Sequence, residues 1–142
     1  MAERLPRVAR FAACALGLSV VPAQADFRAI NAFSVQPVVA DGSVVRVRPL
    51  PGAAIADYFC AAADYAERRL GLPPTAHVTL VDPARRHPGG ARHATLRLTL
   101  EHPRDALGPS YSVRNSVGET RSVATGRLLC RSLWPRVRGV FP

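Results

Sequence analysis

The chain has 142 residues, 19 of which are arginine and none lysine, and its formal net charge is +9. This length fits a single folded domain and excludes a multidomain architecture. The positive net charge suits anionic partners such as nucleic acid, lipid headgroups or acidic polysaccharide. However, missing lysine alongside abundant alanine, glycine and proline is also typical of a GC-rich genome, so composition alone does not establish binding.

Residues 1–25 have the pattern of a secretory signal peptide. A basic head precedes the uncharged run from Phe11 to Val21, and Ala23 and Ala25 supply the small residues of a cleavage site. The run is shorter than the roughly 20 residues that span a bilayer. A buried N-terminal helix is the alternative, and lipidation of Cys14 is disfavoured because Phe11 stands where an aliphatic residue is needed. Cleavage after Ala25 predicts a periplasmic or secreted mature protein.

Two strands are expected after the cleavage site. The first covers residues 27–35 and ends before Pro37. Asp41 and Gly42 then form a strong turn signal. Residues 43–48 alternate, with Val45 and Val47 on one face, and two nearby prolines end this strand because proline cannot donate to a ladder.

Residues 52–70 form the clearest helix of the sequence. Its apolar side chains lie on one arc at 100° per residue, namely Ile55, Tyr58, Phe59, Ala62, Tyr65, Ala66 and Leu70. Asp57 and Asp64 fall on the opposite side, which predicts a solvated helix face. Cys60 lies just off the edge of the apolar arc, where its side chain can reach sideways to another segment. Gly71 ends the helix.

Three further strands are predicted at residues 77–82, 91–100 and 111–117, with a loop at 83–90 after the first of them. Ser122 is expected to cap a short final helix. The order ββαβββα, preceded by the signal-peptide helix, predicts an α+β domain over residues 26–130, with an antiparallel sheet and two helices on one face. A small β-barrel with an incidental helix is the alternative.

Cys60 and Cys130 are the cysteines that remain after removal of the leader. An even pair in a small exported protein predicts a disulfide. On chain-entropy grounds, a link between residues so far apart in the sequence stabilises the fold by roughly 4 kcal/mol. The alternative is a catalytic or redox thiol. A redox pair normally shows C-x-x-C spacing, which this sequence lacks, and a catalytic thiol would leave Cys130 unexplained.

The segment YFCAAADYAERRLG (residues 58–71), followed by a strand pair and a late cysteine, resembles a family of small exported proteins of alphaproteobacteria. Members carry an aromatic-Cys-Ala-rich helix with D-Y/F-A and R-x-L-G. The resemblance covers most of residues 26–130. It implies pairing of Cys60 with Cys130 and no catalytic residue, for a family without an assigned activity. Family members usually stop soon after the last cysteine, so residues 131–142 lie outside this inference.

Five arginines fall on the polar side of the predicted strands and would share the sheet face that the helices leave open: Arg28, Arg46, Arg48, Arg97 and Arg114. Guanidinium groups match phosphate and carboxylate geometry, so this face is a candidate anion-binding surface. An ordinary solvated face, whose arginines discourage edge pairing, is the alternative. The tail of residues 131–142 interleaves aromatic and basic residues, which suits stacking on bases or a membrane interface, or simply packing of Trp134 on the domain.

The sequence contains no recognisable catalytic or metal motif, and we predict no cofactor. His77, His87, His93 and His102 lack the spacing of known zinc motifs. Only His87 and His93 could converge, and two imidazoles without a carboxylate between them are too few for zinc.

These observations favour a non-catalytic periplasmic binding or accessory module. Its partner would be an anionic envelope component or another periplasmic protein. A small envelope enzyme, such as a metal-dependent hydrolase, and an inhibitor or toxin-like factor are the alternatives.

Overall fold

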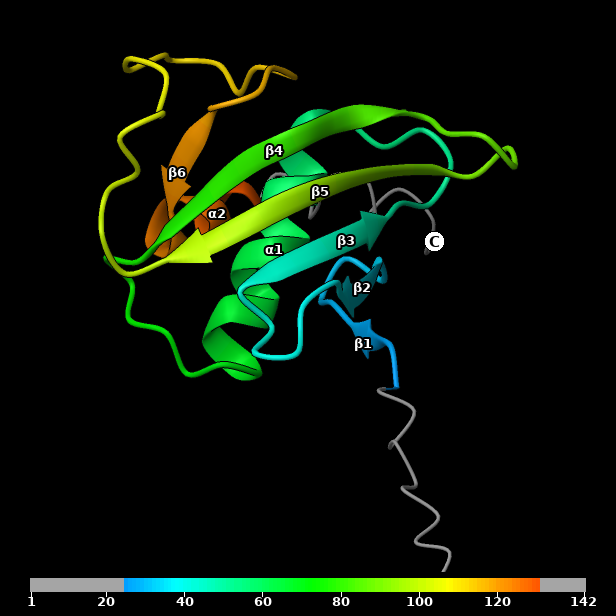
Figure 1. Cartoon of the computed structure of the whole chain (residues 1–142), viewed down its shortest axis with the longest axis horizontal. Helices are drawn as coiled ribbons and strands as arrows, with labels where there is room; N and C mark the ends of the chain where they lie inside the picture. Colours follow the sequence, from blue (N-terminus) through cyan, green and yellow to red (C-terminus); the bar gives the residue numbers. More distant parts are fainter. Residues whose placement is uncertain (1–24, 131–142) are drawn as a thin grey trace, which may run out of the picture.

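The computed structural model describes residues 25–130 and shows a six-stranded sheet with two helices on one face (Figure 1). Nearly all of the predicted signal peptide, with Cys14, and the basic aromatic tail of residues 131–142 lie outside the described residues. The elements are β1 (Phe27–Arg28), β2 (Ser34–Pro37), β3 (Val44–Arg48), α1 (Ile55–Arg68), β4 (His77–Arg86), β5 (Arg92–Thr99), β6 (Thr120–Ser122) and α2 (Val123–Leu129).

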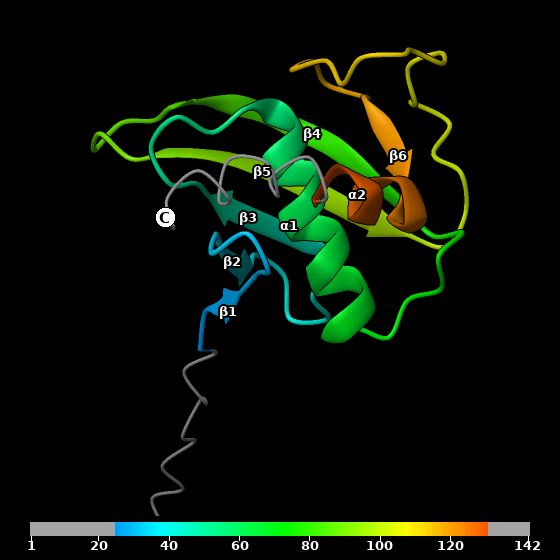
Figure 2. The same ribbon diagram turned by 180° about the vertical axis from the view of Figure 1, so that it is seen from behind.

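Every pair of neighbouring strands is antiparallel, in the order β1-β2-β3-β5-β4-β6. Figure 2 shows α1 and α2 side by side on the same face of this sheet. The predicted α+β class, with an antiparallel sheet and two helices, is confirmed. The two terminal strands are short, and the long β4–β5 hairpin projects beyond the rest of the sheet (Figure 1).

The core forms between α1 and the apolar side of the central strands. Val45, Val47, Leu80 and Leu96 have no exposed surface, and Phe59 of α1 is also fully buried. The alternation of β3 and β5 places these side chains on one face, as expected for strands with one buried side. α1 covers this face because its apolar arc is continuous over the length of the helix.

The two helices approach each other closely at a glycine. A β-carbon at Gly126 of α2 would lie 2.6 Å from the Ala63 methyl group and 3.1 Å from the Phe59 carbonyl oxygen of α1. Ser122 precedes α2 as its N-cap, and its hydroxyl accepts a hydrogen bond from the Thr125 amide at 3.1 Å, so the predicted cap is confirmed.

Three predicted strands differ from the structure. The strand expected at residues 77–82 extends to Arg86, so the first half of the loop predicted at 83–90 is strand. The strand expected at residues 27–35 is divided into β1 and β2 by a turn, in which Ala32 adopts a φ of 65°. The strand expected at residues 111–117 is a loop, and β6 follows it at Thr120–Ser122. Asn115 explains this loop, because its side-chain amide hydrogen-bonds both the amide and the carbonyl of Ala84 in β4. Tyr111 of that segment, predicted to point inward, is fully exposed.

The prediction of a solvated face on α1 is wrong. Asp57 is 6% exposed and Asp64 is completely buried. Asp64 accepts hydrogen bonds from the Ile30 amide and from the guanidinium groups of Arg68 and Arg127. Arg127 belongs to α2, so the second helix packs against the side of α1 that periodicity assigned to solvent. Asp57 bonds the Ala54 amide at the start of α1.

Candidate functional site

The strand register places four of the five predicted arginines on the face away from the helices, namely Arg28, Arg46, Arg48 and Arg97. Arg46 is opposite Thr95 of β5, and Arg48 is opposite Ser34, which is in turn opposite Arg28. Arg46 and Arg48 alternate with Val45 and Val47, which are buried under α1. Opposed residues of antiparallel strands share a face, so this open side carries Arg28, Arg46 and Arg48.

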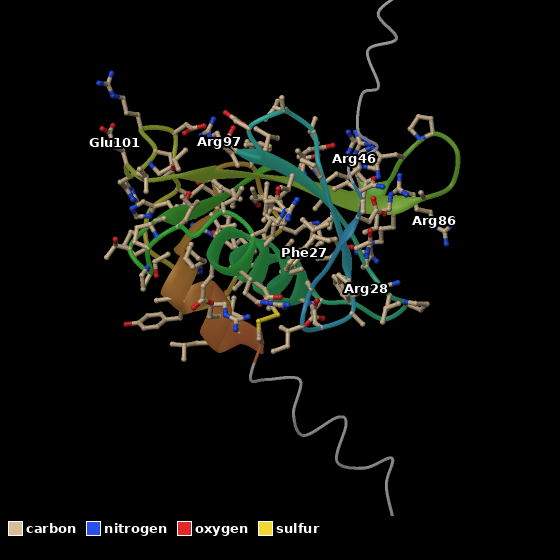
Figure 3. The ribbon with its side chains drawn as sticks, turned by 90° about the horizontal axis from the view of Figure 1, so that it is seen from below. Phe27, Arg28, Arg46, Arg86, Arg97 and Glu101 are labelled. Carbon is tan, nitrogen blue, oxygen red and sulfur yellow. A yellow bond between two sulfur atoms is a disulfide. The ribbon has the colours of Figure 1, made fainter. Side chains whose placement is uncertain are left out.

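Arg97 lies on the same open face, but its charge is already paired. Val44, two residues before Arg46, is opposite Arg97 in the register. The Arg97 guanidinium donates to both carboxylate oxygens of Asp105, at 2.7 and 2.9 Å. These bonds hold the pKa of the Asp105 carboxyl below its usual value. The register makes Arg97 a diagonal neighbour of Arg46, and Figure 3 shows Arg97 on the Glu101 side of Arg46, with Arg86 on the other side.

Arg114 is not part of the sheet. It lies in the loop before β6, where Nε donates to the buried carboxylate of Glu119 at 2.7 Å and Nη2 donates to the Gly108 carbonyl at 2.7 Å. Arg121 bonds the other oxygen of Glu119. The grouping of Arg114 with the strand arginines therefore does not hold, because its segment is a loop rather than a strand.

Arg46 and Arg48 differ from these two arginines. Neither side chain forms a hydrogen bond or an ion pair within residues 25–130, and the Nε atom of Arg46 is buried without an acceptor. The nearby Asp26 accepts hydrogen bonds from Ser34 and Gln36, which lower the pKa of its carboxyl, with smaller contributions from Arg48 and Arg28. Arg28 donates to the Ala32 carbonyl. We call Arg46 and Arg48 the unpaired arginines.

Next to the unpaired arginines, three potential metal ligands come together: Asp82, His87 and His93. Their ligand atoms lie within 4.8 Å of one another, and all three residues are half-buried. The two imidazole rings stack, with centroids 3.5 Å apart. Burial, and then the proximity of His87 and Arg46, lowers the pKa of the His93 imidazole.

Irregular pairing in the β4–β5 hairpin creates this cluster. Leu80 is opposite Leu96, but Asp82 is opposite Thr95, so a bulge adds one residue to β4 and turns Asp82 to the open face. A second irregularity follows before Arg85, which is opposite His93. Pro83 stands between the two shifts, where a residue without an amide hydrogen is tolerated.

Sequence analysis identified the convergence of His87 and His93 but missed Asp82. Strict alternation puts Asp82 on the same side as Val78 and Leu80, facing the helices. Pro83, directly after Asp82, was the one local signal of a bulge. The bulge therefore supplies the carboxylate whose absence made a metal site unconvincing from the sequence.

The predicted disulfide between Cys60 and Cys130 is present, with 5.0 Å between the two Cα atoms. Cys60 is completely buried in α1 and Cys130 is 9% exposed at the end of α2. The bond ties the two helices together and leaves neither sulfur as a free thiol. This arrangement is structural and offers no nucleophile.

Comparison with protein-family models, curated proteins and solved structures finds no match to this chain. The resemblance of residues 58–71 to the alphaproteobacterial family thus stays a prediction. Within residues 25–130, neither helix has the length and apolar character that crossing a membrane requires.

Proposed function

We propose that this chain is an exported, non-catalytic binding module whose open sheet face holds an anionic component of the cell envelope. The leader-like residues 1–25 support export, and a disulfide is typical of proteins in oxidising compartments. The fold leaves one face of the sheet uncovered by helices, which is a rigid platform for a ligand.

One observation carries the choice of ligand, namely that the side chains of Arg46 and Arg48 form no ion pair or hydrogen bond within the described residues. The chain pairs many of its other arginines, including Arg97, Arg114 and Arg121. A buried Nε–H without an acceptor costs free energy, and an anion that accepts from Arg46 would remove this cost. Phosphate, sulfate and carboxylate groups accept two hydrogen bonds from one guanidinium.

We expect the R46S/R48S variant to bind heparin, used as a model polyanion, more weakly than the wild-type mature chain. Loss of two contacts should lower the slope of log affinity against log salt concentration by about 1–2. The matched control is R69S/R104S, which removes the same charge from exposed positions outside the sheet strands, at the end of α1 and in the loop after β5. The measurement is affinity at several salt concentrations, with thermal unfolding to verify folding.

Equal losses in the two double variants would mean that heparin responds only to net charge. That outcome would refute a specific anion-binding face, and so would unchanged retention of R46S/R48S. Repeating the titration with anionic and neutral lipid vesicles identifies which class of envelope anion binds.

A further inference from the structure

We infer that Asp82, His87 and His93 form a binding site for a single divalent transition-metal ion of the zinc type. This site lies on the same open face as the unpaired arginines, but it does not depend on the proposed anion binding. Two observations support it beyond the mere proximity of three side chains: an unsatisfied buried nitrogen, and the spacing of the atoms that face each other.

The buried nitrogen is Nε2 of His87. It has no hydrogen-bond partner within the described residues, although the side chain is only 14% exposed. The atom that faces it is Oδ2 of Asp82, at 3.6 Å, which is too long for a hydrogen bond. Two complementary polar atoms thus stand opposite each other without bonding directly.

Their separation matches that of two ligands on one ion. Zinc binds imidazole nitrogen and carboxylate oxygen at about 2.0–2.2 Å, so the ligand atoms of a tetrahedral ion lie roughly 3.4 Å apart. The 3.6 Å gap between His87 and Asp82 is close to this value. Arg85 donates to the other oxygen, Oδ1, and thereby leaves Oδ2 directed at His87.

His93 supplies the third ligand from the opposite strand of the hairpin. Its ring stacks on that of His87 with 12° between the planes, so the His93 ring must rotate about its side-chain bonds before its lone pair converges with that of His87 on one ion. His87 begins the turn that contains Gly89 and Gly90, at the projecting tip of the hairpin. Residues 88–92 of this turn are exposed, and His87 and His93 on either side of them are half-buried.

The ligand types select the metal. Two imidazoles with one carboxylate suit zinc and other transition metals, whereas calcium and magnesium prefer oxygen ligands throughout. Arg46 and Arg48 lie near His93 and repel a dication, which the carboxylate of Asp82 offsets in part. Three protein ligands also leave a position for water or for an anion, and the arginines favour an anion there.

The test is titration of the tag-free, metal-stripped mature chain with Zn²⁺ by calorimetry, and with Co²⁺ by visible absorption. We expect one equivalent of metal and a Co²⁺ spectrum of low coordination number. D82N and H93A should each weaken Zn²⁺ binding by at least about 10-fold, because even outer-sphere changes cost 10–100-fold. Both exchange half-exposed groups near the hairpin tip, and circular dichroism verifies their fold.

H102A is the matched control. His102 forms a second histidine pair with His77, edge to face at 4.9 Å, and this pair is not part of the three-residue cluster. H102A should therefore bind Zn²⁺ within about 2-fold of wild type, well below the effect of losing a ligand. Absence of stoichiometric binding, unchanged affinity in D82N and H93A, or an equal loss in H102A would each overturn the site. None of these results depends on heparin binding.

Discussion

The C60A/C130A variant is expected to lose roughly 4 kcal/mol of its free energy of unfolding, because the disulfide closes a loop across 70 residues. A domain of this size has a net stability of about 5–15 kcal/mol, so the variant should unfold at a much lower urea concentration. The bond links the last turn of α2 to the middle of α1. Without it, the second helix is held by side-chain packing, by the ion pairs of Arg127 with Asp64 and Glu67, and by backbone hydrogen bonds at its first turn.

Urea unfolding followed by circular dichroism measures this loss. The wild-type chain under reducing conditions is the matched control, and it should unfold at nearly the same midpoint as the double variant. Midpoints of the oxidised wild type and the variant that agree within error would show that the disulfide does not stabilise this fold.

D64A should lose about 3 kcal/mol, the lower end of the range for breaking a buried ion pair. The carboxylate is completely buried and joins three parts of the chain, through the Ile30 amide, Arg68 and Arg127. Its removal leaves the Ile30 amide without an acceptor and the Arg68 guanidinium without its anion, whereas Arg127 keeps its ion pair with Glu67. We place the loss at the lower end because side chains of Arg68 and Arg127 are 54% and 30% exposed and keep part of their hydration.

D105A is the control for D64A, since Asp105 also forms an ion pair with arginine but is exposed. Exposed ion pairs contribute little to stability. D105A should therefore unfold at almost the same urea concentration as the wild type. Equal urea midpoints for D64A and D105A would contradict the assignment of Asp64 as the centre of the contact between the helices.

Elements with a strong periodic pattern were predictable from the sequence. α1 and β5 follow their hydrophobic spacing, and Ser122 caps α2 as its side chain suggests. Two features were not predictable from local patterns. Asp64 looked solvated because periodicity describes one helix and not the second helix that packs against it. The loop at residues 111–117 alternates like a strand, but Asn115 holds it by side-chain bonds to β4.

In the candidate sites, too, local sequence patterns predicted some features and missed others. Alternation along β3 correctly placed Arg46 and Arg48 on the open face. Alternation could not show that Arg97 forms an ion pair with Asp105 and Arg114 one with Glu119, because loops bring these partners together. Asp82 reaches the histidines only because of a bulge, and alternation always assigns such a residue to the wrong face.

Taken together, the unpaired arginines and the metal ligands describe one surface with two separable properties. Arg46 lies beside His93, and it is opposite Thr95, which is in turn opposite Asp82. A metal with a free coordination position and two unpaired guanidinium groups would bind the same anion from adjacent sides. Heparin affinity of R46S/R48S, measured without added metal, and Zn²⁺ affinity of D82N, measured without heparin, therefore test the two proposed properties one at a time.

Export and oxidation of the chain are the basis of the proposed function, and one mass measurement tests both. The full-length chain would be produced in a bacterial host with a periplasm, and the recovered protein analysed intact, with and without reduction. We predict a product that begins at Asp26 and gains about 2 Da on reduction, as expected when one disulfide takes up two hydrogens. A chain that stays in the cytoplasm with residues 1–25 attached and both thiols reduced would contradict the account.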